Sequence, residues 1–203
     1  MSRDGPTVYV IDDDDAVRQS LEWLISSIDM KVVSFPSATA FLDAYIPDQL
    51  GCLVTDVRMP GFSGLDLQDE LSRRGFDIPV IIITGHGDVQ TAVRAMKAGA
   101  YDFVEKPFND QVLLDLVNRA VGDHIKASQQ RAEKAVVQAR LDSLTPRELQ
   151  VLEFISTGNS NKKIAHTLDI SEKTVEAHRA KVMEKMHTKS LAELVKMVMS
   201  LKD

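Results

Sequence analysis

The sequence predicts a doubly wound α/β domain with a five-stranded parallel sheet, followed by a smaller all-α domain with a helix-turn-helix. In the first part of the chain, five short apolar runs alternate with segments of helical periodicity. The charge balance then changes: residues 1–122 hold 10 Lys/Arg against 19 Asp/Glu, and residues 123–203 hold 14 against 11. We therefore expect domains at 1–122 and 143–203, joined by a helical linker at 123–142.

The five apolar runs give the expected strands in chain order. They are Thr7–Ile11, Lys31–Phe35, the run ending at Asp56, Pro79–Thr84 and Tyr101–Glu105. Pro79–Thr84 is the most apolar run and predicts a central strand, since central parallel strands are buried on both faces.

Helical segments follow each run, and their starts and stops are marked by short polar residues or glycine. A helix follows the aspartates at 12–15, a second is capped by Ser37, and a third carries Leu65, Leu67 and Leu71. A fourth covers Asp88–Ala98 and ends at Gly99, and a fifth passes through Val112 to Ala120. Five alternating pairs predict a sheet covered by helices on both faces.

Composition narrows the class of protein. Apolar residues make up 44% and charged residues 27%, which indicates a folded globular chain. Cys52 is the single cysteine, which fits a reducing compartment, and no apolar stretch is long enough to span a bilayer. We therefore expect a cytoplasmic protein without a membrane partner. Residues 123–142 are rich in helix formers but lack sustained apolar heptads, so a coiled-coil dimer seam is the alternative to a simple linker.

Polar side chains with matched chemistry follow the strands. They are Asp12 and Asp13 after the first strand, Asp56 after the third, Thr84 after the fourth and Lys106 after the fifth. The carboxyl ends of parallel strands meet at one edge of a sheet, so these groups should converge. Clustered carboxylates repel unless a cation lies between them, and Mg²⁺ prefers such oxygen ligands. A hydroxyl and an ammonium would complete an anion site around a phosphoryl group on Asp56.

Each of these residues also has an ordinary explanation. An aspartate at the end of a strand can cap its own turn, and Asp14 and Asp15 suit the start of a helix. Thr84 and Lys106 taken singly could be a strand-end hydroxyl and a solvated charge. Their coincidence at matching strand ends favours the functional interpretation.

The start of the second domain is marked by a dense helix signal. Thr145 is the expected N-cap, Pro146 takes the first helical position and Glu148 closes a capping box. A short helix at Asn161–Leu168, a tight turn and a further helix capped by Ser171 then predict a helix-turn-helix. Residues 159–189 carry seven Lys/Arg against four Asp/Glu, which favours nucleic acid, with a solvated basic bundle as the alternative.

Residues 7–121 resemble the receiver domain of two-component response regulators, a CheY-like or flavodoxin-like fold. The motifs are the Asp12-Asp13 pair, Thr-Asp-Val-Arg-Met-Pro-Gly at 55–61, Thr84 and Lys106-Pro107. The resemblance implies that a sensor histidine kinase phosphorylates Asp56 to an aspartylphosphate. It also implies a Mg²⁺ site made by Asp12, Asp13, Asp56 and the Arg58 backbone carbonyl, with Asp13 binding directly and Asp12 through water.

The same resemblance assigns roles to three further residues. Thr84 contacts the phosphoryl group, Lys106 forms an ion pair with it, and Phe103 occupies the aromatic switch position. Many family members carry Tyr there, and Phe lacks the hydroxyl, so a Tyr-type hydrogen bond is not expected. His86 lies in the following loop, where a residue without a catalytic role is the simpler interpretation.

The second domain resembles the LuxR/NarL-type DNA-binding domain. The matching segments are Leu144–Glu148, Asn161–Ala165 and Ser171–Arg179. The resemblance places the helix at Glu172–Met186 in a major groove, with phosphate contacts from Lys162, Lys163, Arg179 and Lys181. The base-edge candidates are Lys173, Thr174, Glu176 and Ala177.

Two of these positions carry alternatives. Glu176 departs from the basic residue that many relatives have, and it either accepts from cytosine or faces solvent. His178 either contacts DNA or makes an internal hydrogen bond. The order of domains and the Thr-Gly-His-Gly-Asp loop at 84–88 resemble the FixJ subgroup.

Together the resemblances imply a transcription regulator that is switched by phosphorylation of Asp56 and is not an enzyme with its own substrate. Its implied partners are a sensor kinase, promoter DNA, RNA polymerase and a second copy that joins on phosphorylation. One rival is a Mg²⁺-dependent aspartyl phosphatase, but such enzymes carry an aspartate where this chain has Arg58. The other rival is a DNA-binding protein that does not depend on phosphorylation and whose receiver is vestigial.

Overall fold

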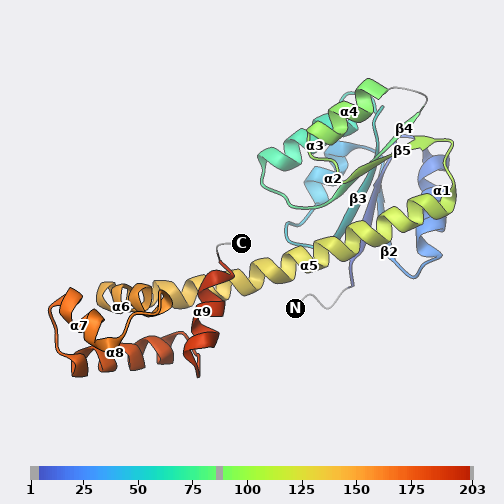
Figure 1. The fold of residues 1–203 in the computed structure, drawn as a ribbon. Helices are drawn as coiled ribbons and strands as arrows, with labels where there is room; N and C mark the ends of the chain where they lie inside the picture. Colours follow the sequence, from blue (N-terminus) through green and yellow to red (C-terminus); the bar gives the residue numbers. More distant parts are fainter. Residues whose placement is uncertain (1–4, 86–88, 202–203) are drawn as a thin grey trace. The chain divides into compact units, whose positions relative to one another are not determined.

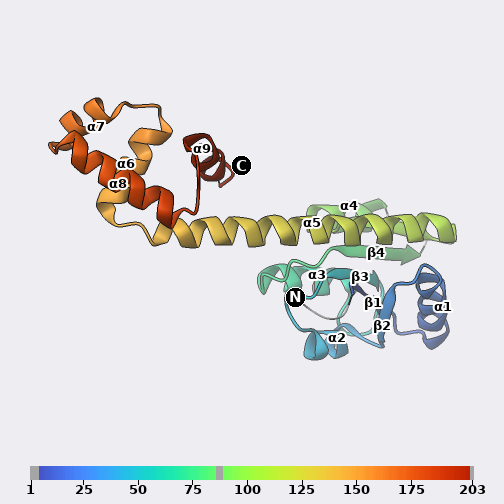
Figure 2. The same ribbon diagram turned by 90° about the horizontal axis from the view of Figure 1, so that it is seen from below.

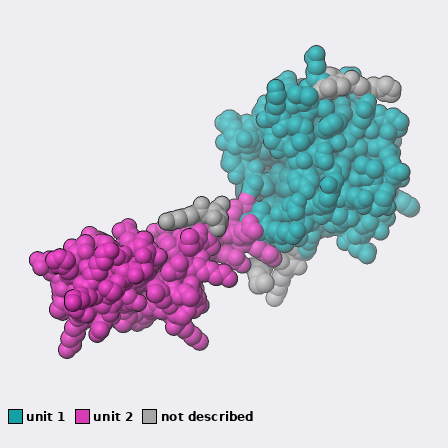
Figure 3. Space-filling model, viewed as in Figure 1, with its two compact units in different colours: residues 1–128 teal, residues 129–203 magenta. Residues whose placement is uncertain are grey.

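The computed structural model describes residues 5–85 and 89–201 and divides the chain into two compact units, residues 1–128 and 129–203 (Figure 3). The division lies inside a single helix of 33 residues, α5 (Asp110–Asp142), which contains the whole expected linker. His124 of that segment is buried in the first unit, while Val137 and Leu141 pack against the core of the second. The N-terminal end of the expected linker therefore belongs to the first unit, and its C-terminal end packs against the core of the second.

The first unit is built on a parallel sheet with the strand order β2-β1-β3-β4-β5 (Figure 1). Its strands are β1 (Thr7–Ile11), β2 (Lys31–Phe35), β3 (Gly51–Asp56), β4 (Val80–Gly85) and β5 (Asp102–Lys106). The predicted doubly wound fold is confirmed, and β4 and β5 each begin one residue later than the apolar runs indicated.

Helices cover both faces of this sheet (Figures 1 and 2). One face packs against α1 (Asp15–Ser26) and the first part of α5, and the other against α2 (Ala38–Ala44), α3 (Gly64–Arg73) and α4 (Val89–Lys97). The three central strands β1, β3 and β4 therefore face a hydrophobic core on both sides, which explains why they are nearly continuous apolar runs. The edge strands β2 and β5 are only partly buried.

Short polar side chains begin the helices, as the sequence predicts. The Asp14 carboxylate accepts from the backbone N–H groups of Ala16 and Val17 at the start of α1. Ser37 caps α2. Ser63 caps α3 in a reciprocal capping box with Asp66, whose pKa is lowered mainly by its hydrogen bonds from Ser63. Asp14 thus has the structural role that its position at a helix start indicates.

The second unit contains α6 (Pro146–Ser156), α7 (Asn161–Leu168), α8 (Glu172–Lys185) and α9 (Leu191–Met199), with the end of α5. The predicted capping box at the start of α6 is present: Thr145 N–H donates to Glu148 over 2.8 Å and Glu148 N–H donates to the Thr145 hydroxyl over 3.3 Å. The sequence reasoning did not anticipate α9. Its signals are the N-cap Ser190 and an apolar face on which Leu194 is fully buried.

Replacement of Gly51 by alanine should destabilise the first unit. Gly51 starts β3 at φ +154°, and a Cβ atom there would lie 1.8 Å from the Thr7 carbonyl oxygen on the paired strand β1. Gly51→Ala must displace one of two central strands, so we expect a loss of more than about 2 kcal/mol. Denaturant unfolding of the full chain, followed by circular dichroism, measures this.

Gly122→Ala is the matched control, because Gly122 lies in α5 with nothing within 4 Å of its added Cβ. It should be neutral or stabilise by up to about 1 kcal/mol, the helix preference of alanine over glycine. Equal stability of the two variants would contradict this account of the β1–β3 contact.

Candidate phosphoryl site and nucleic-acid interface

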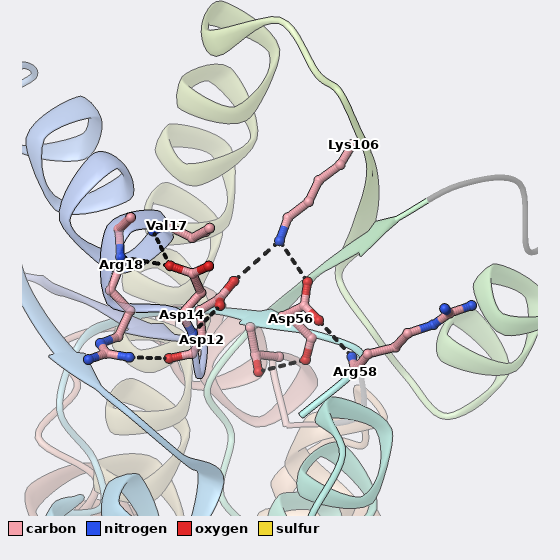
Figure 4. A network of polar contacts seen from close by, with 9 residues as sticks. Asp12, Asp14, Val17, Arg18, Asp56, Arg58 and Lys106 are labelled. Carbon is pink, nitrogen blue, oxygen red and sulfur yellow. Dashed lines mark hydrogen bonds and ion pairs between the residues drawn. The ribbon is translucent and has the colours of Figure 1, made fainter. Parts of the chain in front are cut away.

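Asp12, Asp56 and Lys106 lie together at the carboxyl ends of β1, β3 and β5 (Figure 4). The Lys106 Nζ atom is 2.8 Å from Asp56 Oδ1 and 3.2 Å from Asp12 Oδ2. The side chains of Asp12 and Asp56 are 5% and 12% exposed, and that of Lys106 is 31% exposed. One ammonium group therefore compensates two nearly buried carboxylates that would otherwise repel each other.

The environment of Lys106 favours its charged form. Partial burial by itself would lower the pKa of Lys106, but the hydrogen bonds and negative charges of Asp56 and Asp12 outweigh it and raise that pKa above its usual value. Lys106 therefore remains a cation at neutral pH, placed to contact any anionic group attached to Asp56.

The Asp56 carboxylate is held from two directions. Oδ1 accepts from Lys106, and Oδ2 accepts from the Arg58 backbone N–H over 2.7 Å. The loop after β3 turns back tightly, since Gly64 N–H donates to the Val57 carbonyl over 3.1 Å. A Cβ atom on Gly64 would lie 2.3 Å from the Asp56 carbonyl oxygen, so this close approach requires glycine.

Asp12 is also fixed by its neighbours. Its Oδ1 accepts from Asp14 N–H over 2.9 Å, and its backbone carbonyl accepts from the Arg18 guanidinium over 2.7 Å. Arg18 additionally forms an ion pair with Asp15 (Figure 4 shows its contact with Asp12). The sequence reasoning missed Arg18, although an arginine one turn into a helix that follows four aspartates was a usable signal.

Of the three carboxylates that were expected to converge, the structure joins two through Lys106. Asp12 and Asp56 come together, but Asp13 is exposed, and within residues 5–85 and 89–201 no three His, Cys, Asp or Glu side chains gather as a metal site. The ammonium of Lys106 takes the place between the two carboxylates that a cation was expected to fill. The donor chemistry still fits Mg²⁺, which binds through one or two carboxylates and completes its shell with water.

Thr84 and Phe103 do not join the ion-pair network. Thr84 is the residue before the last one of β4, is 5% exposed, and its hydroxyl donates to the Gly85 carbonyl over a long 3.4 Å. Phe103 lies on the edge strand β5 and is 38% exposed. His86 to Asp88, the last three residues of the Thr-Gly-His-Gly-Asp match, lie outside the described residues, and so does the expected start of the fourth helix at Asp88.

In the second unit most of the candidate DNA contacts face solvent. Exposed residues are Lys162 and Lys163 on α7 and Lys173, Thr174, Glu176, Ala177 and Lys181 on α8. The opposite side of α8 is buried through Val175 and Val182. The two helices thus present one polar surface over a shared apolar core, as a helix-turn-helix requires.

His178 and Arg179 are only half-buried and differ from the other candidates. The Arg179 guanidinium donates to Asn161 at the start of α7 over 3.0 Å, so it already connects the two helices. The His178 ring makes no hydrogen bond to any other residue that the structure describes. Lys181 forms an exposed ion pair with Glu184 over 2.8 Å, which solvent and salt weaken.

Lys185 was counted among the basic residues of this region, but its role is internal. Its Nζ lies 2.7 Å from the Glu148 carboxylate and donates to the Ser143 carbonyl over 3.0 Å. Chiefly the hydrogen bond from Lys185, helped by that from Thr145 N–H, lowers the pKa of Glu148 to about 2. The end of α8 is therefore tied to the start of α6 by a nearly buried ion pair.

Two family models match the chain. Residues 8–118 match the response regulator receiver domain, and residues 142–198 match the bacterial regulatory proteins of the luxR family. The transcriptional regulatory protein FixJ of Azorhizobium caulinodans is 51% identical over 95% of this chain and 91% of its own. FixJ of Rhizobium meliloti is 48% identical over 96% of this chain and 95% of the FixJ chain.

Solved structures of similar proteins cover nearly the whole chain. The response regulator StyR is 44% identical with a TM-score of 0.88, over 96% of this chain and 98% of its own. Full-length FixJ from B. japonicum is 46% identical with a TM-score of 0.61, over 97% of each chain.

The ion pair of Glu148 makes the second unit sensitive to acid. The pKa of Glu148 falls from 4.5 to about 2 on folding, so its carboxylate contributes stability above about pH 5 that is lost as the pH falls towards 2. The shift sets an upper limit of about 3 kcal/mol on this contribution, because solvent reaches Lys185 and weakens the pair. Glu148→Gln should therefore destabilise this unit at pH 7, with the difference from the wild-type chain vanishing near pH 2.

Calorimetry of the full chain from pH 7 to 2 measures the effect. Glu184→Gln is the control, because Glu184 also pairs with a lysine but is 68% exposed, and it should change stability little. A difference between wild type and Glu148→Gln that stays constant with pH would contradict the assignment.

Proposed function

The chain belongs to the two-component response regulators that join a receiver domain to a LuxR-type DNA-binding domain, and we propose that Asp56 is its phosphoryl acceptor. Such a chain is a phosphorylation-dependent transcription regulator, with a histidine kinase as phosphodonor and DNA as target, and is not an enzyme in the usual sense. The carrying observation is the Lys106 ammonium shared between Asp56 and Asp12. We assign the receiver to 1–122, the linker to 123–142 and the DNA-binding domain to 143–203.

In the proposed transfer, an Asp56 oxygen attacks the phosphorus of the donor's phosphohistidine. The new P–O bond forms as the P–N bond breaks, and the imidazole leaves with the bonding electron pair. Lys106 neutralises charge on the phosphoryl oxygens, and the Arg58 N–H stays on the second carboxylate oxygen. A Mg²⁺ ion held by Asp12, Asp13, Asp56 and the Arg58 carbonyl would supply further positive charge to the phosphoryl group.

The proposed switch passes through β4 and β5 to α4. Thr84 turns its hydroxyl towards the phosphoryl group and Phe103 repacks, which changes the α4–β5 surface. That surface carries exposed apolar side chains: Val93 is 47%, Met96 44% and Phe103 38% exposed. We assign it as the homodimer surface of the phosphorylated protein, since exposed apolar side chains favour association.

For the DNA complex we assign phosphate contacts to Lys162, Lys163, Arg179 and Lys181, and base-edge contacts to Lys173, Thr174, Glu176 and Ala177. His178 stays a candidate for either group. A dimer would read paired half-sites about one helical turn apart, or a multiple of that spacing. We also propose RNA polymerase as a partner, and the cytoplasm as the location of the protein. Among the helices that the structure describes, none has the length and hydropathy to cross a membrane.

The phosphatase rival is disfavoured by Arg58, whose side chain occupies the position where those enzymes carry a second aspartate. The relatives are transcription regulators, which points the same way. A vestigial receiver is distinguished from a working one by the following experiment.

Replacement of Asp56 by asparagine should abolish phosphorylation. Incubated with acetyl phosphate and Mg²⁺, the wild-type chain should gain the mass of one phosphoryl group in intact-protein mass spectrometry, and Asp56→Asn should gain none. Asp69→Asn, an exposed aspartate of α3, should behave as wild type. A mass increase that persists in Asp56→Asn would place the acceptor elsewhere, and none in the wild type would indicate a vestigial receiver.

Lys181→Ala should weaken DNA binding and reduce its dependence on salt. Loss of one phosphate contact lowers the slope of log affinity against log salt by about 0.9 and the affinity by roughly three- to tenfold. Lys126→Ala is the matched control, because both lysines are exposed and pair with an acid three residues away. Fluorescence titration with random-sequence duplex DNA measures both, and an unchanged slope would argue against this contact.

A further inference from the structure

Gln68 is a polar side chain in an otherwise apolar contact between α3 and α4. It is 3% exposed, and its neighbours on the buried face of α3 are Leu67 and Leu71. Its amide Nε2 donates to the Ala95 carbonyl on α4 over 3.2 Å. Its Oε1 is also buried and, in the part of the chain that the structure describes, has no hydrogen-bond partner.

The orientation of this amide is fixed by the acceptor that it faces. Exchanging its nitrogen and oxygen would set Oε1 against the Ala95 carbonyl oxygen, which would place two acceptors together. That carbonyl also accepts from Ala100 N–H over 3.0 Å, at the point where α4 ends and Gly99 takes φ +90°. Gln68 therefore contacts the end of α4 that leads directly into β5.

The contact gains one hydrogen bond and leaves one buried acceptor unmet. A neutral hydrogen bond contributes less to stability than an unsatisfied buried acceptor removes. Any displacement that admits water to Oε1 is therefore favoured, relative to an apolar side chain of the same size. A cavity of about 320 Å³ lies alongside, lined by Gln68 and by Ala98 and Gly99 at the end of α4. A small movement of that end would open Oε1 to the cavity.

The rest of the α4 contact is also small. The described side chains of α4 that are buried are Ala92 and Ala95, whereas its larger residues Val93 and Met96 are exposed. Alanine buries little apolar area, so few contacts oppose a movement of α4. The neighbouring helix α3 by contrast buries three leucines.

We propose that Gln68 is a positioning residue that lowers the free energy needed to displace the C-terminal end of α4 when the receiver switches. This inference rests on the proposed function, because it deepens the route from Asp56 to the α4–β5 surface. Gln68 acts through α4 and β5, because its hydrogen bond goes to Ala95 of α4.

The test replaces Gln68 by methionine, which keeps a side chain of similar length but removes both polar atoms of the amide. The reporters are the amides of Ala98, Gly99 and Ala100, whose hydrogen bonds to Arg94, Met96 and Ala95 close the end of α4. In the unphosphorylated full chain, Gln68→Met should slow hydrogen exchange of these amides about fivefold. That factor corresponds to a change in opening free energy of about the size of one hydrogen bond. Amides of β1 should not change by as much.

Leu71→Met is the matched control, since it places the same residue on the same buried face of α3, at a position whose side chain has no hydrogen-bonding group. In Leu71→Met, the ratio of the exchange rates of the Ala98–Ala100 amides to those of the β1 amides should equal the wild-type ratio. Unchanged exchange at Ala98–Ala100 in Gln68→Met, or an equal change throughout the first unit, would overturn the proposal. Faster exchange would show that Gln68 holds α4 in place, which also overturns it.

A second measurement separates this proposal from the proposed function. After acetyl phosphate and Mg²⁺, the wild-type reporters should exchange faster, and those of Gln68→Met should respond less at the same phosphorylated fraction, measured by intact mass. An equal response of the two would overturn the role in switching. Failure of the wild-type chain to gain mass would instead contradict the proposed function, while leaving the comparison of unmodified proteins valid.

Discussion

The ammonium of Lys106 is the constraint on which the first unit depends, because it lies between two carboxylates that could not otherwise be buried together. The three residues come from β1, β3 and β5, and β4 separates the last two strands. Their side chains meet only if all strands run parallel and end at one edge. The two apolar cores on either side of the sheet fix that register, so the geometry of the site follows from the packing of the whole domain.

Phosphorylation would act on this charge balance directly. An added phosphoryl group carries more negative charge than the carboxylate that it modifies and offers more acceptor oxygens. Lys106 would then be shared between the more negative phosphoryl group and Asp12, and neutral hydrogen-bond donors nearby would gain a new acceptor. Thr84 is the described hydroxyl at the end of the neighbouring strand, and its long hydrogen bond to Gly85 is a weak contact to give up.

Ion pairs in the second unit show how burial separates structural from available charges. Lys185 and Glu148 are largely removed from solvent, and the lowered pKa of Glu148 reflects the strength of their hydrogen bond. Lys181 and Glu184 make a contact of nearly the same length, but both side chains are mostly exposed. Charge counted along the sequence does not distinguish these cases. The structure removes Lys185 from the candidate DNA surface and leaves Lys181 on it.

Sequence periodicity predicted the strands and most helices because each apolar run had a defined period and a cap or glycine at its end. The convergence of Asp12, Asp56 and Lys106 followed from strand ends in a parallel sheet. What could not be predicted depends on contacts between distant residues, such as Arg18 on the Asp12 carbonyl and Gln68 on α4. The helix α9 was missed although its cap and apolar face were visible.

The distribution of packing over α3 and α4 explains where a conformational change is cheapest. Removing a leucine-sized contact from a core destabilises by about 2–5 kcal/mol, and removing an alanine contact costs far less. In the proposed switch, the signal from a phosphorylated Asp56 would be limited to a few kcal/mol, because it would arise from new contacts to one modified side chain. A helix anchored by three leucines, such as α3, would resist a signal of that size. A helix whose described buried side chains are alanines, and whose end contacts a half-satisfied amide, would respond to it. The same helix has Val93 and Met96 on its outer face, so an element with sparse inner packing also carries exposed apolar side chains.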